Sequence, residues 1–121
     1  MLLLERDIGF DNVYPSGYTS CVVEIRKTEA FAKWIDSLRD IRARARILAR
    51  IERLAYGNPG DAKPIGEGVS ELRIDYGPGY RVYFKKVGLT IVILLVGGNK
   101  KTQRQDIEKA LTLARNLKGG R

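Results

Sequence analysis

Apolar and polar residues alternate on both sides of the turn Gly77-Pro78-Gly79. An alternation with a period of two predicts two half-buried strands that form one hairpin, over residues 71–76 and 80–85. With Gly77 to Gly79 as the loop, the opposed pairs are Tyr76 with Tyr80, Asp75 with Arg81, Ile74 with Val82, Arg73 with Tyr83, Leu72 with Phe84, and Glu71 with Lys85. A slip by one residue would mix the polar and apolar faces, so the pattern supports this register.

One face of the predicted hairpin is polar and is called the polar wall. Its residues are Glu71, Arg73, Asp75, Arg81, Tyr83 and Lys85. Opposite charges paired across strands stabilise a sheet by about 0.2–1 kcal/mol each, which is the plainest reason for such a face. The alternative is a binding surface for a polyanion, and for this we expect the wall to stay open as a concave basic surface.

Two helices are predicted before the hairpin. Residues 21–26 are predicted to form a short strand, and Thr28 then offers an N-cap to a helix expected to run to about Leu38. Asp40 caps a second helix, which ends near Tyr56 because Gly57 suits the left-handed position that terminates helices.

The second helix carries an apolar side and an arginine stripe. We expect its buried side to consist of Ile41, Leu48, Ile51, Leu54 and Ala55. The arginine stripe consists of Arg42, Arg46, Arg50 and Arg53. A solvated helix face, a ridge that contacts phosphates and a surface for a partner protein are all compatible with this stripe.

The hairpin is followed by a third strand and a last helix. Residues 89–96 are apolar apart from Thr90, which predicts a strand inside the sheet and covered on both faces. Residues 102–105 match a capping box that opens a helix to about Leu117, with Ile107, Ala110, Leu111 and Ala114 inside. The element order predicts one α+β domain over residues 21–121, with about four antiparallel strands, two N-terminal helices and one C-terminal helix. Residues 1–20 lack periodicity and are predicted to be an irregular extension.

The charge of the chain is strongly positive. It has 22 Lys and Arg against 14 Asp and Glu, a formal charge of +8. Residues 1–20 contribute −2, so the remainder carries +10. Such a surplus favours nucleic acid, an acidic protein or an anionic membrane surface as partner. The longest apolar run, residues 91–96, is far too short to span a bilayer, and no secretory signal is recognisable. We therefore expect a cytoplasmic protein that does not act at a membrane.

Cysteine and histidine restrict the chemistry. Cys21 is the single cysteine and there is no histidine. An intramolecular disulfide, a cysteine metal cluster, most zinc sites and Ser-His or Cys-His mechanisms are thereby excluded. Catalysis must rest on Lys, Arg, Tyr, Asp or Glu, and we expect neither a metal nor a cofactor.

Several motifs together resemble the RelE/ParE toxin superfamily, and within it the phage Gp49-like or HigB-type addiction-module killer proteins. The resemblance spans about residues 22–117 and leaves residues 1–20 aside. The matching positions are Trp34, residues 50–54, residues 57–61, Lys63, residues 66–69, residues 71–73, residues 76–83 and residues 94–100.

The resemblance implies a RelE-like fold and the toxin of a type II toxin–antitoxin system. Such a toxin arrests translation by cutting mRNA on the ribosome, and its partner is a cognate antitoxin, commonly a helix-turn-helix protein. The ParE branch shares the fold and attacks DNA gyrase, which leaves gyrase inhibition as an alternative. A second alternative is a non-catalytic module that binds RNA or the ribosome.

Metal-free RNA cleavage uses the 2′-hydroxyl as the nucleophile on its own phosphate. Arg81 is the first candidate for the scissile phosphate, because its planar guanidinium fits phosphate oxygens and the resemblance places the catalytic arginine there. Arg73 and Lys100 are the supporting cations. Tyr83 is expected to transfer a proton or to stack on a base, with its pKa lowered by flanking cations.

Further residues complete the candidate site. Glu71 and Asp75 are rival bases, or else ion-pair partners of Lys85 and Arg81. The candidate RNA-binding residues are Lys63, Lys85, Lys101, Gln103, Arg46, Arg50 and Arg53.

Overall fold

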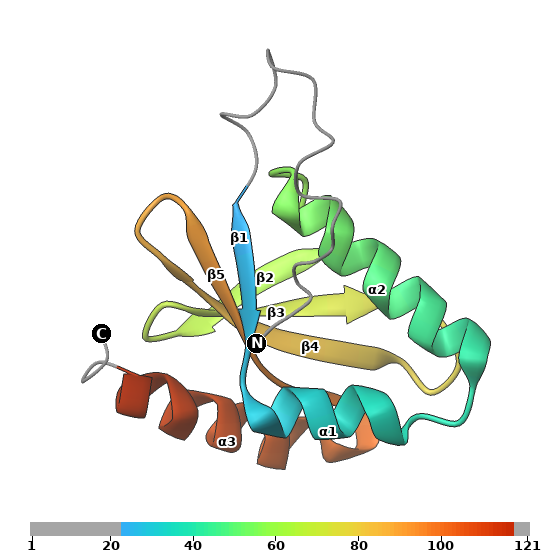
Figure 1. Ribbon diagram of the computed structural model, residues 1–121. Helices are drawn as coiled ribbons and strands as arrows, with labels where there is room; N and C mark the ends of the chain where they lie inside the picture. The colour runs from blue at the N-terminus through green and yellow to red at the C-terminus, as the bar shows by residue number, and fades with distance from the viewer. Residues whose placement is uncertain (1–22, 118–121) are drawn as a thin grey trace.

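The computed structural model describes residues 23–117, and the predicted extension over residues 1–20 lies outside them (Figure 1). The elements in chain order are β1 (Glu24–Lys27), α1 (Glu29–Ser37), α2 (Ile41–Ala55), β2 (Ala62–Gly66), β3 (Val69–Ile74), β4 (Tyr80–Val87), β5 (Ile91–Asn99), the 3-10 helix η3 (Lys100–Thr102) and α3 (Gln103–Asn116). The α+β class is confirmed. None of the helices in this described range is long and apolar enough to cross a membrane.

The strands form one sheet in the order β1-β5-β4-β3-β2. The prediction of antiparallel strands is wrong for one pair, because β1 runs parallel to β5, and it is correct for the other neighbours, which are antiparallel. The sheet has five strands rather than about four because the edge strand β2 was not predicted. The sequence around Pro64 does not indicate a strand, since proline lacks the N–H of a ladder bond and is tolerated mainly in edge strands. β5 lies inside the sheet, as predicted.

The helices cover the two faces of the sheet unequally. On one face α1 and α2 bury a core that includes Leu72 and Val82, and on the other α3 packs against Val69 and Leu95. Leu72 and Val69 come from the same strand, so the period of two directs its side chains into both layers.

Local capping signals identified the starts of α1 and α2 correctly. Thr28 Oγ1 accepts a hydrogen bond from the Phe31 N–H at 3.0 Å, and Asp40 accepts from the N–H groups of Arg42 and Ala43. The predicted capping box at the start of α3 is wrong. Asn99 forms the box with Thr102 around η3 instead, and Thr102 makes no side-chain cap to α3.

The hairpin register differs from the prediction by two residues. Ile74 pairs with Tyr80, Arg73 with Arg81, and Glu71 with Tyr83. The loop therefore has five residues, 75–79, and Asp75 leaves the strand. Because a shift by two preserves the period, the faces stay separate, but the predicted pairs of Asp75 with Arg81 and of Glu71 with Lys85 are wrong.

Gly97 in β5 lies directly under Trp34 of α1, and a Cβ added there would overlap the indole ring. The ring also contacts Phe31 and Tyr80, at centroid distances of 5.8 and 6.3 Å. Its freedom to move is therefore small. We expect Gly97→Ala to lower the free energy of unfolding by about 1–3 kcal/mol. Urea unfolding measures this, with Trp34→Ala as the background control, where adding Gly97→Ala should be nearly neutral. An equal loss in both backgrounds would contradict the overlap.

Candidate functional site

The polar wall is divided into a covered and an uncovered part. α3 packs across Tyr83. The ring lies in a buried cluster with residues of β3, β5 and α3, so this part of the face is covered. The expectation that the whole wall stays open is therefore wrong. The upper part of the wall, meaning the part nearer the hairpin loop, holds Arg73 and Arg81 on neighbouring strands, with side chains 38% and 12% exposed. This upper part, next to the start of α3, is the candidate site.

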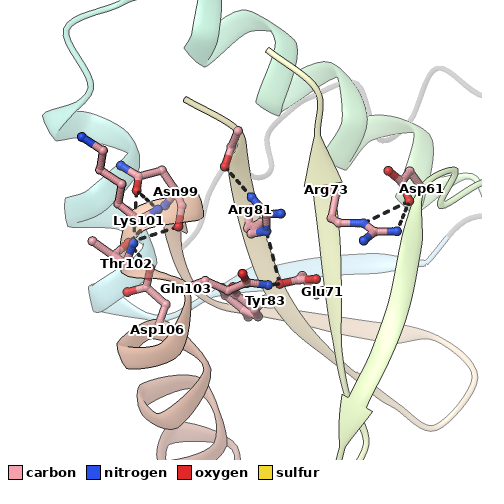
Figure 2. A network of polar contacts seen from close by, with 11 residues as sticks. Asp61, Glu71, Arg73, Arg81, Tyr83, Asn99, Lys101, Thr102, Gln103 and Asp106 are labelled. Carbon is pink, nitrogen blue, oxygen red and sulfur yellow. Dashed lines mark hydrogen bonds and ion pairs between the residues drawn. The ribbon is translucent and has the colours of Figure 1, made fainter. Parts of the chain in front are cut away.

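A buried carboxylate lies at the base of the site (Figure 2). Glu71 is fully buried, and its Oε2 accepts hydrogen bonds from the Tyr83 hydroxyl at 3.0 Å and from Gln103 Nε2 at 2.7 Å. The Nε of Arg81 lies 3.4 Å from the same oxygen. An unpaired buried carboxylate would be very unfavourable, so these three side chains make its burial possible.

Arg81 is held on a second side as well. Its Nη1 donates to the Gly79 carbonyl oxygen at 2.8 Å. Two atoms of this network are buried without a hydrogen-bond partner among the described residues, Glu71 Oε1 and Arg81 Nε. The guanidinium is thus fixed beside a carboxylate, while its other N–H groups remain for a ligand.

Arg73 is neutralised separately, by a residue that the sequence reasoning missed. Asp61 Oδ1 accepts from Arg73 Nε at 3.2 Å and from Nη2 at 2.9 Å. Figure 2 shows this pair to one side of Arg81. Each of the two opposed guanidiniums therefore has its own carboxylate, which offsets their repulsion. Asp61 gave no signal beyond its place in a turn motif, because its partner lies on another strand.

Tyr83 does not have the environment that was predicted. Its side chain is fully buried, and this burial, followed by the charge and hydrogen bond of Glu71, raises the pKa of the phenol. The expected lowering by cations is wrong, because a phenolate here would face the Glu71 carboxylate out of water. Stacking on a base is equally excluded in this arrangement. Tyr83 instead holds Glu71 in place.

The raised pKa of Tyr83 has a measurable consequence. Below about pH 10, the phenol is neutral in both states and its contribution to stability is complete. Above about pH 10, the unfolded chain releases this proton and the folded chain keeps it, so stability falls by up to about 1.4 kcal/mol per pH unit. Tyr83→Phe should remove this part of the slope. Urea unfolding of both proteins between about pH 9 and 11 tests it, and parallel curves would contradict it.

Lys100 and Lys101 lie at the edge of the site, on the side of Arg81 away from Arg73. Both follow β5 in η3 and are exposed. A Cβ placed on Gly79 would lie 3.2 Å from Arg81 Nη1 and 3.6 Å from Lys100 Cβ, so Gly79 lies between these two residues. The structure therefore brings Arg73, Arg81 and Lys100 to one region, as the sequence predicted.

The other candidate RNA-binding residues are spread more widely. Lys63 lies opposite Glu71 on β2 and is exposed, and Lys85 lies opposite Val69, away from Arg81. Gln103 is engaged with Glu71 rather than free for RNA. Thr102 and Asp106, which share a short hydrogen bond between their side chains, add a polar edge that was not predicted.

The arginine stripe lies on α2, which covers the opposite face of the sheet from α3. Arg50 donates to the carbonyl oxygens of Arg73 at 2.5 Å and Pro59 at 2.9 Å. Burial lowers the pKa of the Arg50 guanidinium, and neighbouring Arg53 lowers it further. Arg50 therefore fastens the loop before β2 to the end of β3. The structure does not bring Arg46, Arg50 and Arg53 together with Arg81.

No group of three or more His, Cys, Asp or Glu side chains within residues 23–117 could hold a metal ion. Near Arg81, the Glu71 carboxylate is instead engaged with Tyr83, Gln103 and Arg81 itself. The arrangement offers positive charge at a fixed position, which suits the binding of a phosphate group.

Comparisons with known proteins give three similarities. The model of the family described as phage-derived protein Gp49-like matches residues 33–118. An uncharacterized protein from Haemophilus influenzae is 50% identical over 95 residues, which cover 78% of this chain and 96% of that protein. A chain of the toxin–antitoxin complex RelBE2 from Mycobacterium tuberculosis aligns with a TM-score of 0.43 and 22% identity, over 65% of this chain and 99% of that chain. This structural similarity is distant.

Proposed function

This chain belongs to the phage-derived Gp49-like family, and on that premise we propose that it is the toxin of a toxin–antitoxin pair, a metal-independent endoribonuclease that cuts mRNA on the ribosome. The observation that carries the proposal is the placement of Arg81. Its guanidinium is fixed between Glu71 and the Gly79 carbonyl, opposite Arg73 and beside Lys100. This is a preorganised cationic site of the kind that stabilises charge on a reacting phosphate.

The proposed reaction is a transesterification within the RNA. The 2′-hydroxyl oxygen forms a bond to phosphorus, its proton is lost, the bond from phosphorus to the 5′ oxygen breaks, and that oxygen takes up a proton. The products are a 2′,3′-cyclic phosphate and a 5′-hydroxyl. Negative charge grows on the phosphate oxygens, where Arg81 donates hydrogen bonds and Lys100 adds positive charge, while the charge of Arg73 is partly offset by Asp61.

The three side chains that were candidates for proton transfer do not lie where they could reach an RNA held by Arg81. Glu71 and Tyr83 are both fully buried, so neither contacts a bound RNA in this arrangement. The exposed Asp75 lies in the loop on the α2 side of the sheet, where it lines a groove with Arg46. Catalysis therefore rests on charge stabilisation and on alignment of the 2′-hydroxyl with the phosphate. We expect slow cleavage of free RNA and fast cleavage only where the ribosome holds the mRNA in that geometry.

The experiment uses purified protein with ribosomes carrying a defined mRNA. We expect cuts within codons, with cyclic phosphate ends on the upstream fragments, and little cutting without ribosomes. Expression of the protein alone should arrest growth. Arrest with intact mRNA and inhibited gyrase would move the assignment to gyrase inhibition, and ribosome binding without cutting would move it to a binding module.

A further inference from the structure

The outward face of α2 exposes apolar side chains that no described element covers. Ile41 is 77% exposed and Leu48 is 49% exposed, and Ala45 between them is also exposed. The three residues follow the spacing i, i+4, i+7, so they form one row along the helix. A continuous row of exposed apolar residues along one helix face, unlike residues scattered singly, is a candidate surface for a partner.

A second row on the same helix is cationic. Arg42 and Arg46 each follow an apolar residue of the first row by one position, so this row lies about 100° further round the helix. Arg53 continues it, and all three are exposed. Arg46 is stacked on Tyr76 at 4.6 Å from the ring centroid. The helix as a whole has five arginines against one glutamate.

A groove of about 300 Å³ adjoins the cationic row, between α2 and the end of β3. It is lined by the apolar residues Ala49 and Ile74 and by the charged residues Arg46, Arg50, Arg53 and Asp75. Arg50 is occupied by loop carbonyls, so Arg46 and Arg53 are its available cations. The groove offers an apolar contact next to guanidinium groups.

We propose that this face of α2 is the docking surface for an acidic amphipathic helix of a partner protein. An apolar stripe of the partner packs on Ile41, Ala45 and Leu48, and carboxylates on its flank pair with Arg42, Arg46 and Arg53. RNA would satisfy the arginines but leave Ile41 and Leu48 in water, so the combination favours a polypeptide. The identity of this partner as the antitoxin rests on the proposed function, whereas the chemistry of the surface does not.

The position of the surface has a consequence for inhibition. α2 packs on the face of the sheet opposite α3, and Arg81 lies beside the start of α3. A helix docked on α2 alone therefore leaves Arg81 accessible. RNA and the partner helix should bind simultaneously.

The test uses isotope-labelled protein and two probes. One probe is a helical peptide of about five turns with a leucine stripe flanked by glutamates, compared with a scrambled peptide of equal composition. The other is a short single-stranded RNA. We expect the designed peptide to shift the amide signals of α2 and the RNA to shift those around Arg81, with no competition between them. RNA shifts concentrated on α2, or equal binding of both peptides, would overturn the proposal.

Charge reversal supplies matched variants. Arg42→Glu, Arg46→Glu and Arg53→Glu combined should weaken peptide binding by at least about tenfold. Lys27→Glu, Lys86→Glu and Lys109→Glu change the net charge equally at exposed positions elsewhere, and should have a much smaller effect. Equal effects of both triple variants would overturn the proposal, because only net charge would then be recognised. Circular dichroism checks that both variants are folded. Failure of RNA cleavage leaves this test intact, since peptide binding does not depend on it.

Discussion

Arg81→Ala is expected to reduce ribosome-dependent mRNA cleavage by about 10²–10³-fold, the usual loss when one preorganised donor to a reacting group is removed. Arg81 is 12% exposed and its guanidinium is fixed by contacts on two sides. A phosphate bound there, as proposed, would meet a guanidinium that does not need to reorganise. The measurement is the single-turnover rate of cutting on mRNA-programmed ribosomes, with ribosome binding measured in parallel.

Two controls separate chemistry from folding. Removing Arg81 leaves the buried Glu71 without its cation, which lowers stability by several kcal/mol. The double variant Arg81→Ala with Glu71→Gln removes that charge and should recover much of the stability while staying inactive. Arg104→Ala removes an exposed arginine from the first turn of α3 and should cut normally. A folded double variant that cuts at the rate of the parent protein would exclude Arg81 from catalysis.

Ile47→Ala is expected to lower the free energy of unfolding by about 2–5 kcal/mol, whereas Leu48→Ala should change it by less than about 0.5 kcal/mol. Ile47 is fully buried in the core beneath α2, and Leu48 next to it is 49% exposed. Urea unfolding of both variants measures the difference. The two substitutions delete similar volumes from neighbouring positions of one helix, so each is the control for the other. Comparable losses would mean that α2 packs with a different side toward the sheet.

The same pair of residues shows where sequence patterns stop being sufficient. The predicted buried side of α2 was correct for Ile51 and Leu54 and wrong for Ile41 and Leu48. The helix contains two apolar rows at helical spacing, and periodicity alone does not choose between them. The choice is made by the sheet, since Ala43 and Ile47 pack against strands that are distant in the sequence.

The site was predictable in its composition but not in its contacts. A period of two places Arg73, Arg81 and Tyr83 on one face in either register, so their grouping was predicted correctly. The partners of Glu71 were not, because Gln103 is 32 residues away and arrives with α3. The burial of Tyr83 and the direction of its pKa shift follow from that same helix.

The sequence by itself determined the features that depend on residues within a few positions of one another. These are the caps at Thr28 and Asp40, the two-faced hairpin and the positive charge of the body. Tertiary structure decided the even register shift, the side of α2 that is buried and the division of the cationic residues between opposite faces of the sheet. The physical reason is that an even shift, or a helix rotated from one apolar row to the other, leaves the local pattern unchanged. Only packing between distant segments distinguishes these arrangements in free energy.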